Sequence, residues 1–268
     1  MDDGEDGLGD RTDVRDTHTR DPDAPSVASA LLAGAALYNE GHVLAAHDPW
    51  EAAWLPLDSG TDRSIDEPLN EPFDEPLDES LDESLGDAEA TDERLLHGLI
   101  AFVAATHHAR SRNWTGATGC AENAVEHLAG LTDRPRGVDL APVRAWCRRL
   151  AADPETVERA SPPSLRIGDA VPGFDALDLR AVSLAAPALA EAVDGEAVDV
   201  GAVDVRTAPV FERAVALARE ERGTGKTTFT ELLFAFCREP ETRPQVAARL
   251  ADHVELADRK RRDVADLF

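Results

Sequence analysis

Apolar residues recur at helical spacing along most of the chain, and no segment shows the apolar–polar alternation that predicts a substantial sheet. The spacing predicts helices over residues 26–40, 42–55, 94–110, 114–128 and 138–150, and over 177–193, 209–222, 228–238 and 242–267. Ser26 and Asn113 are the expected N-caps, and Gly41 is expected to end the first helix. The predicted fold class is therefore all-α: a compact helical bundle of antiparallel helix pairs, followed by a second helical region.

Two polar segments interrupt this pattern. Residues 1–24 are rich in Asp and nearly free of large apolar residues, so they are predicted to be a disordered acidic tail. Residues 57–92 repeat four-residue units such as Asp66-Glu67-Pro68-Leu69, and a recurring proline is incompatible with a helix. This part is predicted to be a disordered acidic insertion within a helical domain of residues 25–160. It is either a solvated connection or a docking segment, in which case its apolar anchors are Leu69, Phe73, Leu77 and Leu81.

Prolines also mark the second half of the chain. Pro162-Pro163 is the predicted boundary before a C-terminal helical region of residues 161–268. Within that region, Pro187 is expected to kink its helix or to end it early, because proline removes one backbone donor and clashes with the preceding turn.

The charge balance narrows the classes of partner. The chain has 27 Lys and Arg against 53 Asp and Glu, a formal net charge of −26, and this excludes nucleic acid as a direct partner. Only Lys226 and Lys260 are lysine; all other cationic side chains except histidine are arginine. Abundant carboxylates with few lysines indicate adaptation to high salt. Coding from a GC-rich genome is the alternative explanation for the missing lysines.

The cysteines and the apolar runs indicate in which cellular compartment the protein is expected. Cys120, Cys147 and Cys237 form no CxxC pair, so neither a disulfide framework nor a thiolate zinc site is indicated. The acidic N-terminus lacks the charge of a signal peptide, and the longest apolar run, residues 28–38, is too short to cross a bilayer. A soluble cytoplasmic protein without a membrane partner is predicted.

The segment Gly223-Thr224-Gly225-Lys226-Thr227-Thr228 ends like a phosphate-binding loop. The full motif requires glycine at the position of Glu220 and a preceding buried strand, and here an amphipathic helix precedes it. A turn between two helices, capped by Thr227 or Thr228, is therefore predicted, and no nucleotide site. The basic run Arg259-Lys260-Arg261-Arg262 is interpreted as complementing a helix dipole, with a dock for the acidic repeat as the alternative.

The strongest chemical pattern lies in the first helical part. His47 and Glu51 are one helical turn apart, Trp50 and Trp54 are placed to flank the same face together with Leu44, and His107 ends the apolar helix expected to pack against them. A further histidine, His108, is placed on a neighbouring face, and His42, His97 and His127 are expected to be exposed.

Several of these residues, with others nearby, match the pattern of a known family. The matching positions are Asn39 and Gly41, then His47, Glu51 and Trp54, then Gly98-Leu99-Ile100, His107 and Asn113. Over about residues 28–130 the chain resembles a family known as domain of unknown function number 309, in a salt-adapted, haloarchaeal version. The chain departs from the family pattern at Ala101, where glutamine is frequent, and at Arg112, where the family has glycine. The resemblance implies a compact all-α domain and no established activity.

Three interpretations of His47, Glu51 and His107 remain open. They form a buried hydrogen-bonded cluster covered by Trp50 and Trp54, or hold a divalent metal through two imidazoles and a carboxylate, or act as a general acid and base. The leading hypothesis is a non-enzymatic cytoplasmic helical protein that acts as a protein-interaction module, with no cofactor beyond that possible metal. The alternative is a metal-dependent hydrolase of a small molecule. The sequence does not indicate an oligomeric state.

Overall fold

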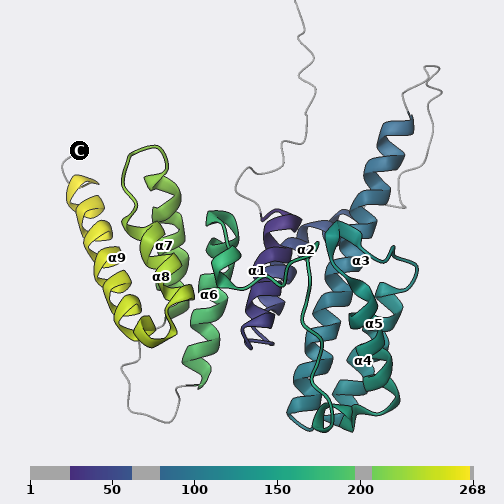
Figure 1. Cartoon of the computed structure of the whole chain (residues 1–268). Helices are drawn as coiled ribbons and strands as arrows, with labels where there is room; N and C mark the ends of the chain where they lie inside the picture. Colours follow the sequence, from purple (N-terminus) through teal and green to yellow (C-terminus); the bar gives the residue numbers. More distant parts are fainter. Residues whose placement is uncertain (1–24, 62–78, 197–206, 266–268) are drawn as a thin grey trace, which may run out of the picture.

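The computed structural model describes residues 25–61, 79–196 and 207–265, and throughout these ranges the fold is all-α (Figure 1). The helices are α1 (Val27–Asn39), α2 (His47–Thr61), α3 (Glu79–Arg110), α4 (Trp114–Leu128), α5 (Leu140–Ala152), α6 (Leu179–Glu196), α7 (Thr207–Glu221), α8 (Thr228–Arg238) and α9 (Arg243–Ala265). Four short 3-10 turns lie between them, at Pro135–Gly137, Pro154–Glu158, Phe174–Ala176 and Pro240–Thr242. Within the described ranges no strand forms, only two isolated bridges of Ile167. The predicted fold class is confirmed.

Helices α1 and α6 lie at the centre of the molecule (Figure 1). On one side, α2 to α5 form a bundle around the long α3. On the other side, α7 and α8 pack against α6, and the outer helix α9 packs against α7 and α8. Helix α1 contains no charged residue and is buried from Ser29 to Tyr38 except at Leu32, because it packs against both α2 and α6. The two helical parts predicted from the sequence are thus joined through the contact between α1 and α6.

The boundaries of α1 and α2 follow local signals. The Ser26 side chain accepts a hydrogen bond from the amide of Ser29, as expected of an N-cap, and Gly41 ends this stretch with φ +96°. Helix α2 starts at His47 rather than at residue 42, because the residues between Gly41 and His47 form turns. Leu44 therefore lies in the turn and is 51% exposed, whereas Trp50 in α2 is fully buried, so they do not share one helix face.

Helix α3 corrects the prediction for residues 57–92. Residues 57–61 belong to α2 and residues 79–92 to α3, so both ends of the predicted insertion are helical. The reason is visible in the sequence, because Ser80 and Ser84 stand where the earlier repeat units have proline. Asp92 is almost fully buried, and its carboxylate accepts two hydrogen bonds from Arg136, at 2.7 and 2.5 Å. The predicted tail of residues 1–24 and the expected anchors Leu69, Phe73 and Leu77 lie outside the described residues, and Leu81 lies in α3.

The bundle around α3 satisfies its buried polar groups internally. Trp146 of α5 is fully buried and donates a hydrogen bond of 3.1 Å to Thr106, whose hydroxyl donates to the carbonyl of Phe102. The side chain of Arg144 donates to the carbonyls of Leu128 and Leu131, and so caps the C-terminal end of α4. These bonds fix α5 against the neighbouring helices.

The segment between α5 and α6 contains the predicted boundary at Pro162-Pro163 and has no regular structure apart from two 3-10 turns and the bridges of Ile167. Helix α6 then runs through Pro187 to Glu196, so of the two outcomes expected for Pro187, a kink or an early end, the early end does not occur. Packing of α6 against α1, α7 and α8 outweighs the loss of one backbone hydrogen bond.

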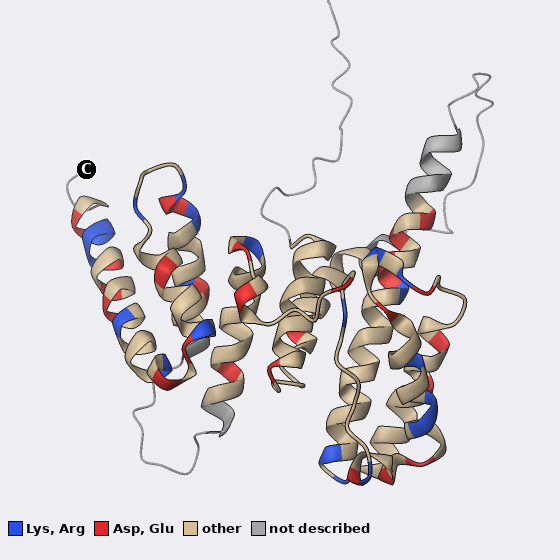
Figure 2. Ribbon diagram, in the orientation of Figure 1, with Lys and Arg blue, Asp and Glu red and all other residues tan. Residues whose placement is uncertain are grey.

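The outer helix α9 carries charged residues of both signs, while α1 at the centre carries none (Figure 2). The three cysteines are free thiols, and Cys147 and Cys237 are buried. None of the described helices is long and apolar enough to span a membrane. Salt adaptation stays a prediction.

Candidate functional site

His47 lies at the start of α2 between two carboxylates. Its Nδ1 atom is 3.5 Å from Oδ1 of Asp48 and 3.7 Å from Oε2 of Glu51. The hydrogen bond to Asp48 raises the pKa of His47, burial opposes this rise, and the charges of Glu51 and Asp48 add to it. The predicted pairing of His47 with Glu51 is therefore present, and Asp48 is a stronger neighbour that the helical spacing did not indicate.

Neither tryptophan covers His47 as predicted. Trp50 belongs to the core, and its buried Nε1 atom has no hydrogen-bond partner in the described part of the chain. Trp54 donates from Nε1 to Oε1 of Glu93 at 3.3 Å, and its ring lies 4.9 Å from His97. His97 in turn stacks on His127, with ring centroids 3.9 Å apart. Trp54 thus connects α2 to α3 and α4.

The histidines predicted to be exposed are not. His42, His97 and His127 are all half-buried, and His42 lies beside the ring of Phe174, 6.2 Å between centroids. Contacts between helices account for this, because His97 and His127 face each other where α3 packs on α4.

His107 lines a hollow that we call the junction hollow. It has a volume of about 590 Å³ and lies between the turn after α1, the start of α2, the end of α3 and the helix α6. Burial lowers the pKa of His107, and the positive charges of His108 and Arg110 lower it further. The residues that line the hollow are Gly41, His42, Val43, Leu44, Ala45, Asp48, His107, Arg110, Ala188, Glu191 and Ala192.

The predicted metal ligands do not form a metal site. In the described ranges, no group of three or more His, Cys, Asp and Glu side chains is placed to hold a metal ion. The three residues therefore do not form one cluster: His47 and Glu51 are neighbours on α2, and His107 lies in the hollow that Asp48, rather than Glu51, also lines.

Other residues of the family pattern have structural roles. The Asn39 side chain binds the extended segment through Leu165 and Pro172. Gly98 lets α4 approach α3, since a Cβ at this position would lie 2.5 Å from Leu128. Asn113 accepts a hydrogen bond from the amide of Gly116 and caps α4, as predicted.

No protein-family model matches the chain. Searches of curated proteins and of solved structures give no match either. The resemblance to family number 309 therefore stays a prediction, and the function is inferred from the residues.

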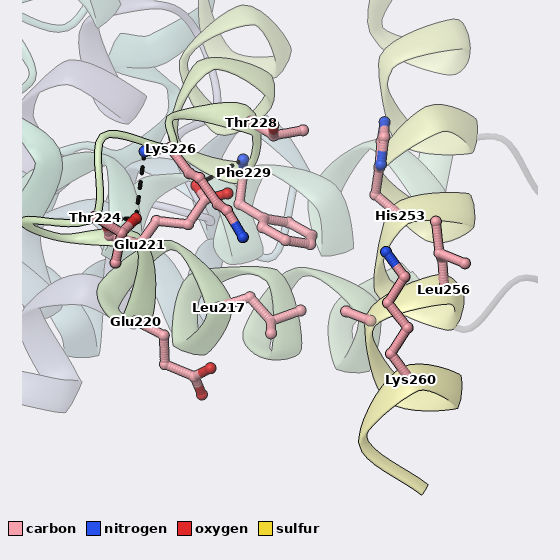
Figure 3. A pocket seen from close by; sticks show the side chains of 11 residues that line it. Leu217, Glu220, Glu221, Thr224, Lys226, Thr228, Phe229, His253, Leu256 and Lys260 are labelled. Carbon is pink, nitrogen blue, oxygen red and sulfur yellow. Dashed lines mark hydrogen bonds between the residues drawn. The ribbon is translucent and has the colours of Figure 1, made fainter. Parts of the chain in front are cut away.

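Residues 223–227 form a turn between α7 and α8, as predicted, and Thr228 begins α8 (Figure 3). Thr227 occupies the N-cap position of α8, but its hydroxyl donates to Glu231 instead of capping. The carboxylate of Glu221 accepts the hydrogen bond from the amide of Phe229, and so takes the place of the cap. The sequence did not indicate this role of Glu221.

Replacement of Asp48 by asparagine is expected to lower the pKa of His47 and to leave that of His107 unchanged, because Asp48 is the main cause of the shift at His47 and contributes none at His107. Titration of the imidazole signals by NMR measures both pKa values.

In the wild type, His47 should titrate above and His107 below the usual pKa of 6.5. His47 thus stabilises the fold at pH values below 6.5, and this contribution is lost as the pH rises through its raised pKa; the contribution of His107 is lost on acidification. Equal titration of the two histidines would contradict the assignment.

Proposed function

We propose that the chain is a non-enzymatic protein-interaction module, and that the junction hollow receives a short segment of a partner protein. The observation that carries the proposal is the composition of the hollow. It combines an apolar wall with several charged side chains, in a volume of about 590 Å³, within the usual range for binding sites. The residues that line it include no hydroxyl or thiol nucleophile.

The apolar side of the hollow suits one apolar side chain of the partner. Ala188 and Ala192 of α6 form a wall of small residues, and Leu44 stands at the rim with half of its surface exposed. Burial of the exposed part of Leu44 by an apolar side chain of the partner would stabilise a complex.

The charges of the hollow favour a basic partner. Asp48 and Glu191 contribute two carboxylates, and Arg110 contributes one guanidinium. The net charge of −26 also attracts basic segments over long distances and repels acidic ones. We therefore propose a partner segment in which an apolar residue stands beside Lys or Arg, with the apolar residue on Leu44 and the cation near Glu191.

Leu44→Asp is expected to weaken binding of such a segment at least tenfold, because a charge replaces an apolar anchor worth about 1.5–3 kcal/mol when buried. Leu55→Asp is the matched control, since Leu55 is exposed to the same degree, 50% against 51%, and does not line the hollow. The measurement is a selection of short peptides displayed on phage, followed by fluorescence anisotropy with the selected peptides.

The selected peptides should share an apolar residue next to Lys or Arg, and should bind the wild type and Leu55→Asp equally. Glu191→Gln should weaken them by a smaller factor. Peptides that bind Leu44→Asp as tightly as the wild type, or a selection that enriches no basic peptides, would refute the proposal.

A further inference from the structure

A second hollow, which we call the lysine hollow, lies in the C-terminal helical region (Figure 3). Its volume is about 390 Å³, and its walls come from the end of α7, the turn before α8, the start of α8 and the outer helix α9. The lining residues are Leu217, Glu220, Glu221, Thr224, Lys226, Thr228, Phe229, His253, Leu256, Ala257 and Lys260.

Both lysines of the chain line this one hollow. Lys226 reaches in from the turn and Lys260 from α9, so that their ammonium groups point toward the same space from opposite sides (Figure 3). Within the described residues, neither ammonium group has an ion pair or a hydrogen bond. Two ammonium groups without an ion pair in one hollow favour an anion that both can contact.

The carboxylates of the hollow are already bound elsewhere. Glu220 forms an ion pair with Arg261, and Glu221 accepts the hydrogen bond of 3.0 Å from the amide of Phe229. Neither carboxylate forms an ion pair with a lysine of the hollow, although Glu221 keeps its negative charge. The anion would be held by the lysine side chains, because the amide of Phe229 at the start of α8 is occupied by Glu221.

In the basic run of residues 259–262, the arginines are already bound to other groups, as the two glutamates are. Arg259 pairs with Glu255 at 2.7 Å, Arg261 pairs with Glu220, and Arg262 donates to the carbonyl of Asp258. Lys260 alone of the four lines the hollow. Within the described residues, the run thus consists of three bound arginines and one lysine that faces the hollow.

The remaining wall is apolar and aromatic. Leu256 is 44% exposed, and the ring of Phe229 meets the imidazole of His253 edge-on, with 6.3 Å between centroids. Leu217 and Ala257 complete this wall. The hollow therefore offers an apolar surface next to its two positive charges.

We propose that the lysine hollow binds a small organic phosphate. The phosphate group lies between the ammonium groups of Lys226 and Lys260, and the organic part lies against Leu256 and Phe229. Such a ligand matches both the charge and the apolar wall, and the volume suits a small molecule. The acidity of the whole chain repels anions, so only a local pair of cations of this kind provides a favourable site.

The test is isothermal titration calorimetry of the full chain with phenyl phosphate, inorganic phosphate and benzoate. Phenyl phosphate should bind more tightly than inorganic phosphate, which lacks the ring, and than benzoate, which carries a single negative charge. Lys226→Gln and Lys260→Gln should each weaken phenyl phosphate about tenfold, the usual contribution of one charge-assisted hydrogen bond.

Arg249→Gln is the matched control, because Arg249 is exposed on the same helix as Lys260 and lies outside the hollow. It removes one positive charge and should leave binding unchanged. Circular dichroism of each variant verifies that the exposed substitutions preserve the helices. The proposal is overturned if phenyl phosphate gives no binding, if Arg249→Gln weakens it as much as Lys260→Gln, or if benzoate binds equally well.

Discussion

Replacement of Gly34 by alanine is expected to lower the free energy of unfolding by about 2–3 kcal/mol, toward the upper end of the usual cost of overpacking a core. Gly34 lies in α1, where a Cβ atom would stand 2.3 Å from the ring of Trp50 and 2.9 Å from the carbonyl oxygen of Ala46. Neither group has room to move, because Trp50 is fully buried and the carbonyl belongs to the backbone. Urea unfolding followed by circular dichroism measures the change.

Gly119→Ala is the matched control for this substitution. Gly119 lies within α4, and a Cβ there would meet no atom within 4 Å. This variant should gain stability by up to about 1 kcal/mol, the difference in helix propensity between glycine and alanine. In a Trp50→Leu background, Gly34→Ala should cost less, because the contact with the ring is gone and only the contact with the Ala46 carbonyl remains. An equal loss in both backgrounds would mean that Trp50 is not the group that alanine meets.

The sequence predicts the local features of the fold well. Ser26 and Asn113 are caps whose partners lie three residues away, so the pattern contains all the information needed. The predicted start of α3 is wrong because the last two repeat units have Ser80 and Ser84 in place of proline, and these units are compatible with a helix. Helix α6 continues past Pro187 because tertiary packing, which no local pattern contains, outweighs the local cost of proline.

In the candidate sites, too, contacts within one helix are predictable from the sequence, and contacts between elements are not. The contact of His47 with Glu51 follows from one turn of a helix and is predictable. The place of His107 depends on how the end of α3 meets α2 and α6, and the pairing of Lys226 with Lys260 depends on how α9 packs beside the turn before α8. Such distances between elements are set by side-chain packing, and a single sequence does not reveal them.

Asn39, one of the positions that carry the family resemblance, holds two parts of the fold together. It ends α1, and its side-chain amide donates to the carbonyls of Leu165 and Pro172, at 3.0 and 2.9 Å. Its Oδ1 atom accepts from the amide of Leu165 at 2.9 Å, and the neighbouring Tyr38 hydroxyl donates to the carbonyl of Pro163. The segment between α5 and α6 is thus fastened to α1 by polar groups rather than by a sheet.

Asn39→Ala is therefore expected to lower the free energy of unfolding by about 3 kcal/mol, since three hydrogen bonds of about 1 kcal/mol each are lost. The amide of Leu165 should also lose its protection from hydrogen exchange, because its acceptor is removed. Asn123→Ala, at an exposed position of α4, is the control and should change stability by less than about 0.5 kcal/mol. If Asn39→Ala were as stable as this control, or if the amide of Leu165 stayed protected, the segment would have to be held by the burial of Leu165 against the core and not by Asn39.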